Sequence, residues 1–169
     1  MNENKKAKIE AIFNNLVDLH KELIDLAKIE YLNLVEADLK ALDEVSLKKE
    51  LIIGEILKKE DERKAILKAV CGFKNKEKIT LKALIEKASK TDVQFSKRLR
   101  IIHKTLLLLV EQIQSQNKKN HELIESSLNH IQEMKSNILN ECSKQTSTYN
   151  KKATKDNKTR GARFLSQEA

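Results

Sequence analysis

Proline and tryptophan are absent from this 169-residue sequence, and glycine occurs only three times. Because proline and glycine are the residues that most strongly disfavour helix interiors, their scarcity permits long, uninterrupted helices. Aromatic residues make up only 4% of the chain and hydrophobic residues 40%, so a thick globular core would be hard to fill. With 34% charged residues, the composition is typical of long amphipathic helices and coiled coils. The sequence therefore predicts an all-α protein.

Motifs that carry enzymatic chemistry are missing as well. The sequence has no phosphate-binding glycine loop, no HExxH helix and no nucleophile elbow. Its two cysteines, Cys71 and Cys142, do not form a CxxC motif, and its four histidines show no i,i+4 pairing. The densest group of carboxylates, at 60–62, lies in a run of mixed charge that is typical of an exposed helix face. We therefore expect no enzymatic activity, no cofactor and no metal site.

Membrane insertion is not expected either. No apolar run reaches the ~18 residues that span a bilayer, and the N-terminal sequence MNENKKAKIE lacks the apolar region of a signal peptide. These features predict a soluble, cytoplasmic protein.

Apolar residues recur every three or four positions along most of the chain, which predicts three long helices and one short helix. The first long helix is expected from about Lys5 to Val35, followed by a break within residues 36–50. The second is expected to end at Cys71-Gly72-Phe73, where glycine suits a C-terminal cap. Thr80 is expected to cap a short helix over 81–88.

The third long helix is expected from Thr91 to Cys142. It begins with the capping-box pattern Thr91-Asp92-Val93-Gln94, and an ideal helix from Asp92 to Cys142 would be ~77 Å long at a rise of ~1.5 Å per residue. The predicted fold is an elongated antiparallel helical bundle or coiled coil of three long helices, with a short connecting helix and a flexible C-terminal tail.

This third helix has two apolar stretches, separated by the polar segment QSQNKKN at 114–120. The stretch IIHKTLLLLV at 101–110 is apolar on more than one face and is expected to be the best-buried part of the protein. After the polar segment the apolar stripe resumes, with a phase that does not continue residues 99–113 cleanly. Its members are Leu123, Ile124, Leu128, Ile131 and Ile138. Because the preceding helices can cover one another, this stripe is expected to be available to a partner.

The C-terminal residues 143–169 differ from the rest of the chain in composition. Seven basic and two acidic residues give them a net charge of +5, out of +8 for the whole chain, with little apolar periodicity. We expect a helical domain over 1–142 and a flexible basic tail over 143–169. The tail could bind nucleic acid, anionic lipid or an acidic protein surface, or simply be solvated. Nucleic-acid binding is not expected, because only Tyr149 and Phe164 are candidates for stacking on bases.

Read in order, these segments resemble the FlgN family of flagellar export chaperones. The resemblance covers most of residues 5–153 and lies in the layout of the whole chain. It is carried by ADLKALDEVSLKKELI at 37–52, DERKAIL at 61–67, TLKALIEKA at 80–88, NKKNHELIESSLNHI at 117–131 and TYNKKA at 148–153. The last segment is similar to a tyrosine-containing tail motif of the family, which often has a glycine where this chain has Ala153.

The resemblance implies a cytoplasmic chaperone of the hook-associated proteins that form the hook-filament junction, which it would deliver to the flagellar type III export apparatus. On this interpretation the client-binding residues are Leu123, Ile124, Leu128, Ile131 and Ile138, with Tyr149 as an additional anchor. Two alternatives stay open. The same residues could pack against the N-terminal half of the first helix, or the stripe could serve self-association in a coiled-coil scaffold protein.

Overall fold

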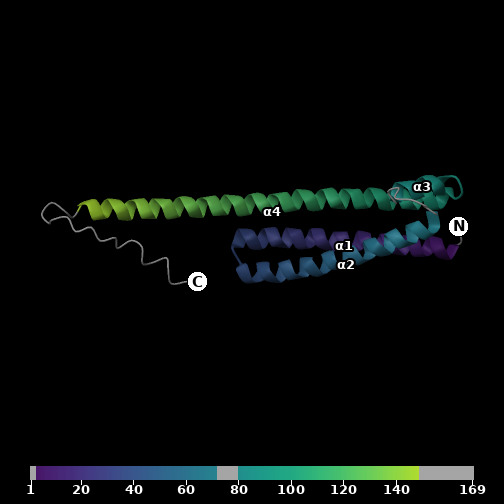
Figure 1. Cartoon of the computed structure of the whole chain (residues 1–169), viewed down its shortest axis with the longest axis horizontal. Helices are drawn as coiled ribbons and strands as arrows, with labels where there is room; N and C mark the ends of the chain where they lie inside the picture. Colours follow the sequence, from purple (N-terminus) through teal and green to yellow (C-terminus); the bar gives the residue numbers. More distant parts are fainter. Residues whose placement is uncertain (1–2, 72–79, 149–169) are drawn as a thin grey trace. The chain divides into compact units, whose positions relative to one another are not determined.

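Four helices make up the part of the chain that the computed structural model describes, which is residues 3–71 and 80–148, with side chains for 3–70 and 80–140. They are α1 (Glu3–Glu36), α2 (Leu39–Cys71), α3 (Leu81–Ser89) and α4 (Val93–Thr148), as shown in Figure 1. These residues contain no strand, and the all-α prediction is confirmed. The glycine cap after Cys71, as well as Tyr149 and the rest of the tail, lie outside the described residues.

The chain divides into two compact units, Met1–Ser126 and Ser127–Ala169. The first unit holds α1, α2, α3 and the first 34 residues of α4, and the second holds the remainder of that helix. Helix α4 is continuous through the polar segment at 114–120 and runs to Thr148, past the predicted end at Cys142.

The connection between α1 and α2 consists of Ala37 and Asp38 alone. Ala37 has a φ of 55°, which is the left-handed conformation that commonly ends helices, and its N–H donates to the Leu34 carbonyl at 3.3 Å. Asp38 then caps the next helix, because its Oδ1 accepts a hydrogen bond from the Ala41 N–H at 3.0 Å. The break predicted within 36–50 is therefore a tight turn, and α2 runs antiparallel beside α1 (Figure 1).

The short helix α3 begins as the sequence predicts. Thr80 has extended backbone angles, and its side chain accepts a hydrogen bond from the Ala83 N–H at 3.3 Å. The apolar face of α3 is entirely buried, so this helix contributes to the core in spite of its nine residues. Its buried residues are Leu81, Leu84, Ile85 and Ala88.

Helix α4 is capped by Asp92, one residue later than the capping-box pattern indicated. Asp92 Oδ1 accepts from the Phe95 N–H at 3.0 Å, and the Asp92 carbonyl accepts from the Ser96 N–H at 3.1 Å. The Thr91 N–H still donates to the Ala88 carbonyl of α3, which places Thr91 in the turn before the helix. A carboxylate at this position also interacts favourably with the N-terminal end of the helix dipole.

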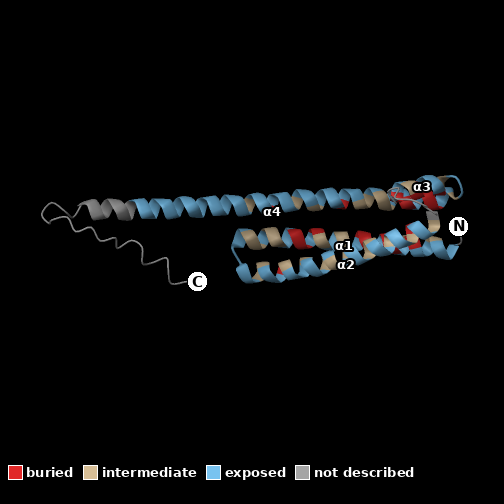
Figure 2. Cartoon of the chain, viewed as in Figure 1, coloured by how far each residue is buried: buried red, intermediate tan, exposed pale blue. Residues whose placement is uncertain are grey.

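The main core of the first unit lies where all four helices meet (Figure 2). Its buried side chains come from α1 (Ile9, Ile12, Phe13, Leu16), α2 (Leu67), α3 (Leu81, Leu84, Ile85, Ala88) and α4 (Phe95, Leu99). A smaller cluster of Val17, Ile24 and Leu109 continues the contact between α1 and α4. Burial of these apolar side chains is the main source of folding free energy in this unit.

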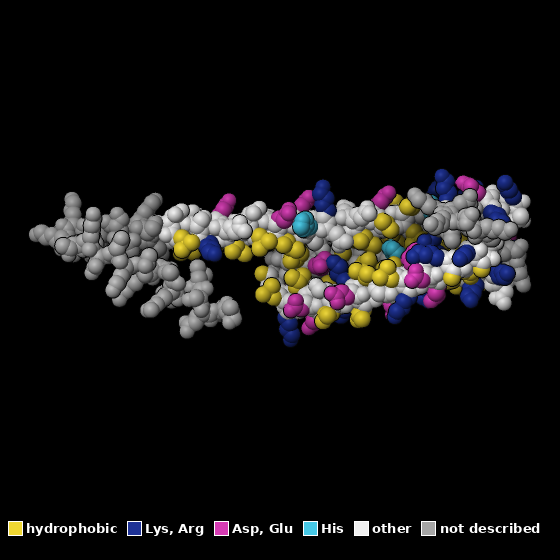
Figure 3. Space-filling model, in the orientation of Figure 1, with side chains coloured by type: hydrophobic (Ala, Val, Ile, Leu, Met, Phe, Trp, Pro, Cys, Tyr) yellow, Lys and Arg dark blue, Asp and Glu magenta, His cyan; other side chains and the backbone are white. Residues whose placement is uncertain are grey.

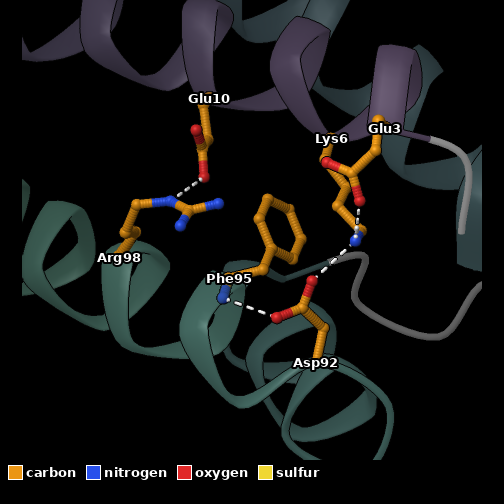
Figure 4. Close-up of polar contacts among 6 residues, drawn as sticks. All are labelled: Glu3, Lys6, Glu10, Asp92, Phe95 and Arg98. Atoms are coloured by element: carbon orange, nitrogen blue, oxygen red, sulfur yellow. Dashed lines mark hydrogen bonds and ion pairs between the residues drawn. The ribbon is translucent and has the colours of Figure 1, made fainter.

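Two ion pairs join the N-terminal turns of α1 to those of α4 (Figure 4). Lys6 Nζ lies 2.6 Å from Asp92 Oδ2, and Arg98 Nε lies 2.6 Å from Glu10 Oε1. The Arg98 guanidinium is also 5.9 Å from the centre of the Phe95 ring, within the range of a cation-π contact. Because residue numbers rise together in both pairs, α1 and α4 run parallel, and α2 is antiparallel to both.

The same contacts set the charge states at this end of the unit. The hydrogen bond from Lys6, with a further one from the Phe95 N–H, lowers the pKa of the Asp92 carboxyl below its ordinary value. Hydrogen bonds to Asp92 and Glu3 raise the pKa of Lys6, and the bond to Glu10 raises the pKa of Arg98. Lys6 and Asp92 therefore favour their charged forms in each other's presence.

The prediction that 101–110 is the best-buried segment is wrong. Ile101 is 66% exposed and Leu108 is 59% exposed, whereas Leu99 and Phe95, nearer the start of α4, are fully buried. A run of consecutive apolar residues points around the whole circumference of a helix, and only the face of α4 that meets its neighbours is covered. The best-buried part of α4 is therefore its first two turns.

The difference between these faces of α4 is testable with one chemical change at two positions. We expect Leu99→Ala to lower the free energy of unfolding by about 2–5 kcal/mol, because it leaves a cavity in the core. The matched control, Leu108→Ala, removes the same atoms from a side chain that is 59% exposed, and we expect a change of less than about 1 kcal/mol. Urea denaturation followed by circular dichroism measures both, and equal losses would contradict the described core.

The Lys6–Asp92 pair predicts a specific acid sensitivity. Since the folded-state pKa of Asp92 is depressed, its stabilisation is present above the unfolded pKa of about 4 and is lost as the pH falls through the folded value. We expect Asp92→Asn, which retains a capping side chain, to flatten the decline in stability below about pH 5. Lys6→Gln should flatten it as well, and Lys8→Gln, an exposed control on the same helix, should not. Denaturant midpoints measured between neutral pH and pH 2 distinguish these variants.

Candidate protein-interaction surface

The polar segment 114–120 contains a buried residue, Asn120, whose side chain is almost inaccessible at 4% exposure. Its Nδ2 donates to the Ala27 carbonyl at 2.9 Å and to Glu30 Oε2 at 2.6 Å. Its Oδ1 accepts a hydrogen bond from Gln116 Nε2 at 3.0 Å. The Asn120 side chain therefore binds both the backbone and a side chain of α1.

Helix α2 completes this polar network. Lys49 Nζ lies 2.7 Å from the same Glu30 oxygen, and the two side chains are only 18% and 17% exposed. Glu30 thus accepts from α2 and α4 at once, and no buried side-chain nitrogen or oxygen among the described residues lacks a hydrogen-bond partner. A satisfied polar group among apolar contacts allows few alternative alignments, so this network fixes the register of three helices.

The stripe on α4 continues across the polar segment. Successive steps of three or four residues lead from Ile113 through Gln116 and Asn120 to Ile124, with no break in the helix. The change of phase read from the sequence is three successive steps of four, from Gln116 through Asn120 and Ile124 to Leu128, which depart from the alternating steps of a strict heptad but stay on the same face of an α-helix. The polar segment therefore contributes a buried residue to the stripe instead of interrupting it.

The covering of this face by α1 ends shortly after Asn120. Four hydrogen bonds between α1 and α4 join residues that are 86 to 93 positions apart in sequence, and Asn120 pairs with Glu30 at a separation of 90. Only six residues of α1 follow Glu30 before its end at Glu36. Since both helices rise equally per residue, α1 can pair with α4 to about residue 126, where the first unit ends.

The predicted site residues lie at and beyond this point. Leu123 is half-buried and Ile124 is 40% exposed, whereas Leu128, Ile131 and Ile138 are 53%, 60% and 58% exposed. The helix brings these residues to one face, and Figure 3 shows hydrophobic side chains along the described part of α4 in the second unit. Tyr149 lies outside the described residues. This stripe of Ile124, Leu128, Ile131 and Ile138 is called the α4 stripe below.

Sequence reasoning missed some exposed apolar residues. Met134 and Leu139 flank the α4 stripe at 51% and 55% exposure, and their spacing of three and eight residues from Ile131 is the signal that could have found them. A second group of exposed apolar residues lies around the connection between α1 and α2. Its members are Ile29, Leu32, Val35 and Leu39, with exposures from 45% to 74%.

A cleft also opens at the other end of the first unit, where α1 and α4 begin. Its floor is apolar, with Val70, Leu84 and Phe95, and lysines including Lys6 line it. Lys6 is already engaged by Asp92, and the described part of the chain contains no group of three or more His, Cys, Asp or Glu residues able to hold a metal ion. The described surfaces are therefore suited to helix packing and apolar association.

Comparison with known proteins agrees with this arrangement. The model of the family described as FlgN protein matches residues 1–157. The chain belongs to the FlgN family. The family resemblance seen in the sequence is confirmed, and membership implies a general role as a flagellar export chaperone that binds flagellar proteins. FlgN proteins form a chaperone family and not a family of enzymes. No curated protein and no solved structure matched the chain.

In residues 3–71 and 80–148, no helix is both long enough and apolar enough to cross a membrane.

The network around Asn120 predicts a large effect of an almost isosteric change. In Asn120→Asp, a carboxylate oxygen would replace the amide Nδ2 that donates to Glu30 and to the Ala27 carbonyl. We expect the free energy of unfolding to fall by about 2 kcal/mol or more at neutral pH. Asn117→Asp makes the same change at an exposed position of α4 and should alter stability by less than about 0.5 kcal/mol. Urea denaturation provides the measurement, and a loss at Asn117 equal to that at Asn120 would argue against the network.

Proposed function

We propose that this chain is a cytoplasmic chaperone that binds hook-associated proteins of the hook-filament junction and delivers them to the flagellar export apparatus. The observation that carries the proposal is the α4 stripe, a row of Leu and Ile side chains that are 40–60% exposed among the residues that the structure describes. Family membership supports the chaperone role in general, and the identity of the clients comes from the resemblance.

The size of the α4 stripe suits reversible binding. Covering a half-exposed Leu or Ile side chain contributes on the order of 1 kcal/mol, so the stripe with its flanking Met134 and Leu139 supplies several kcal/mol in total. Association costs a comparable amount in lost translational and rotational freedom. The resulting affinity is moderate, which a chaperone that must release its cargo requires. An amphipathic helix laid along the stripe is the partner geometry that such a row of side chains favours.

The helical bundle and the basic tail would have separate roles. We infer that α1, α2 and the first part of α4 form an antiparallel coiled-coil-like bundle, supported by the shared core and the network around Asn120. The helical domain would extend over 1–142 and the basic tail over 143–169, although α4 continues through the first six residues of that tail, to Thr148. In this arrangement the bundle holds α4 in a fixed register, and the tail, with its charge of +5, is available for the client or for an acidic patch on the export apparatus.

Self-association as a coiled-coil scaffold is the second candidate function. The observation in its favour is the same α4 stripe, since two copies could cover each other's apolar residues. It predicts that the working state is an oligomer whose mass depends on concentration, which sedimentation velocity over a wide concentration range detects.

Substitutions in the α4 stripe test the chaperone function directly. We expect Leu128→Asp and Ile131→Asp to reduce binding to a hook-associated protein by more than tenfold, because a carboxylate replaces an apolar contact at each site. Thermal melting should change little, since both side chains are more than half exposed. Isothermal titration calorimetry measures the affinity.

The matched control is Asn129→Asp, which places the same carboxylate on the opposite face of α4. It should leave binding to the hook-associated protein unchanged. If the two stripe variants bind as tightly as the unmodified chain, the stripe is not the client surface.

A further inference from the structure

A lysine lies within the α4 stripe. The steps from Ile124 through Leu128, Ile131 and Lys135 to Ile138 are four, three, four and three residues, so Lys135 occupies a stripe position with apolar residues on both sides. Lys135 is the only Lys or Arg between 127 and 140, and Figure 3 shows a Lys or Arg side chain beside hydrophobic ones along this part of α4. A charge therefore interrupts the apolar face that the proposed function assigns to the client.

Helix α4 itself offers Lys135 no counter-charge. A helical residue meets the side chains three and four positions away, which are Ile131, Gln132, Ile138 and Leu139 here. None of them carries a carboxylate, and no ion pair to Lys135 exists among the described residues. By contrast, Lys21 and Lys28 of α1 each pair with an aspartate three residues earlier. The ammonium of Lys135 is thus left for solvent or for a partner.

Burial of the α4 stripe against another helix would bring this ammonium into an apolar seam. Desolvating a charge without a counter-charge is unfavourable, whereas a carboxylate opposite it compensates. In coiled coils, a single lysine at such a core position specifies register and partner at some cost in stability. Lys135 would therefore favour a helix that presents an acidic residue at the facing position.

The same residue disfavours a second copy of this chain. In a parallel, in-register pair the two Lys135 side chains would face each other, and like charges repel. In an antiparallel pair, Lys135 would face some other member of the α4 stripe, and none of these residues is acidic. Lys135 thus selects against both modes of self-pairing while accepting a different chain.

We propose that Lys135 determines partner selectivity at the α4 stripe, and that the partner is an amphipathic helix with apolar residues at alternating three- and four-residue spacing and one Asp or Glu facing Lys135. This inference rests on the proposed function, because it requires that the stripe bind a client helix. It adds the chemistry by which the client is told apart from other amphipathic helices and from a second copy of the chain.

A set of helical peptides tests the pairing without knowledge of the natural client. Each fluorescently labelled 21-residue peptide carries Leu at the core positions except one, which is Glu, Gln or Lys, and the exception is moved through all core positions in turn. This scan places the charge opposite Lys135 for either peptide direction. We expect one Glu peptide to bind the full chain about tenfold more tightly than its Lys counterpart, a preference that weakens with added salt.

Variants of the full chain complete the test. Lys135→Glu should reverse the preference toward the Lys peptide, and Lys135→Leu should abolish it and produce concentration-dependent dimers in sedimentation. Lys119→Glu makes the same charge change at an exposed position off the stripe, so it should keep the Glu preference. Peptides that bind tightly but with equal affinity whatever their charge would overturn the role of Lys135 and leave the stripe as a client surface. Binding of no peptide in the set would overturn both.

Discussion

The parallel pairing of α1 with α4 is the contact on which the rest of the structure depends. It is held at one end by the Lys6–Asp92 and Glu10–Arg98 pairs around the buried Phe95, and at the other end by Asn120 on Glu30. Between them, the clusters around Phe13 and Leu109 supply the apolar contact. Polar contacts at both ends of an apolar interface leave one alignment in which all of them are satisfied. That alignment decides where α1 ends relative to α4, and hence which residues of α4 remain uncovered.

This arrangement separates a part of α4 that stabilises the first unit from a part that exposes apolar residues. In the stabilising part, the buried Leu109 and Asn120 contact α1, whereas the α4 stripe begins four residues after Asn120, at Ile124. Membership of the FlgN family implies a general role as a flagellar export chaperone, and the proposed function requires that a client be bound and then released. A binding face on a single helix, outside the packed core, can be covered and uncovered without unfolding the protein. The polar network makes this independence possible, because it ends the covered region at a defined residue.

Much of the fold follows from local sequence signals, whereas the register does not. The periodicity of Ile9 to Leu26 and the hydroxyl of Thr80 predict helices and a cap correctly, because their partners lie within a few residues. The burial of Asn120 depends on Ala27 and Glu30, some ninety residues earlier, and no local pattern indicates such a contact. The exposure of Ile101 and Leu108 likewise depends on how many neighbours surround α4, which the apolar character of that segment does not reveal. The positions of the α4 stripe could be predicted because helical periodicity alone places these residues on one face, whereas their role in binding a client stays a prediction.

The two-residue connection between α1 and α2 also limits how this chain can vary. Because only Ala37 and Asp38 connect the helices, the connection cannot gain or lose a residue without shifting one of the helices. One extra residue passed into α2 would turn that helix by about 100° about its own axis. Val45 and Leu67 would then leave their buried positions, and Lys49 would leave Glu30. Insertions and deletions are therefore better tolerated elsewhere in the chain. The length of this connection sets the register of α2 against α1.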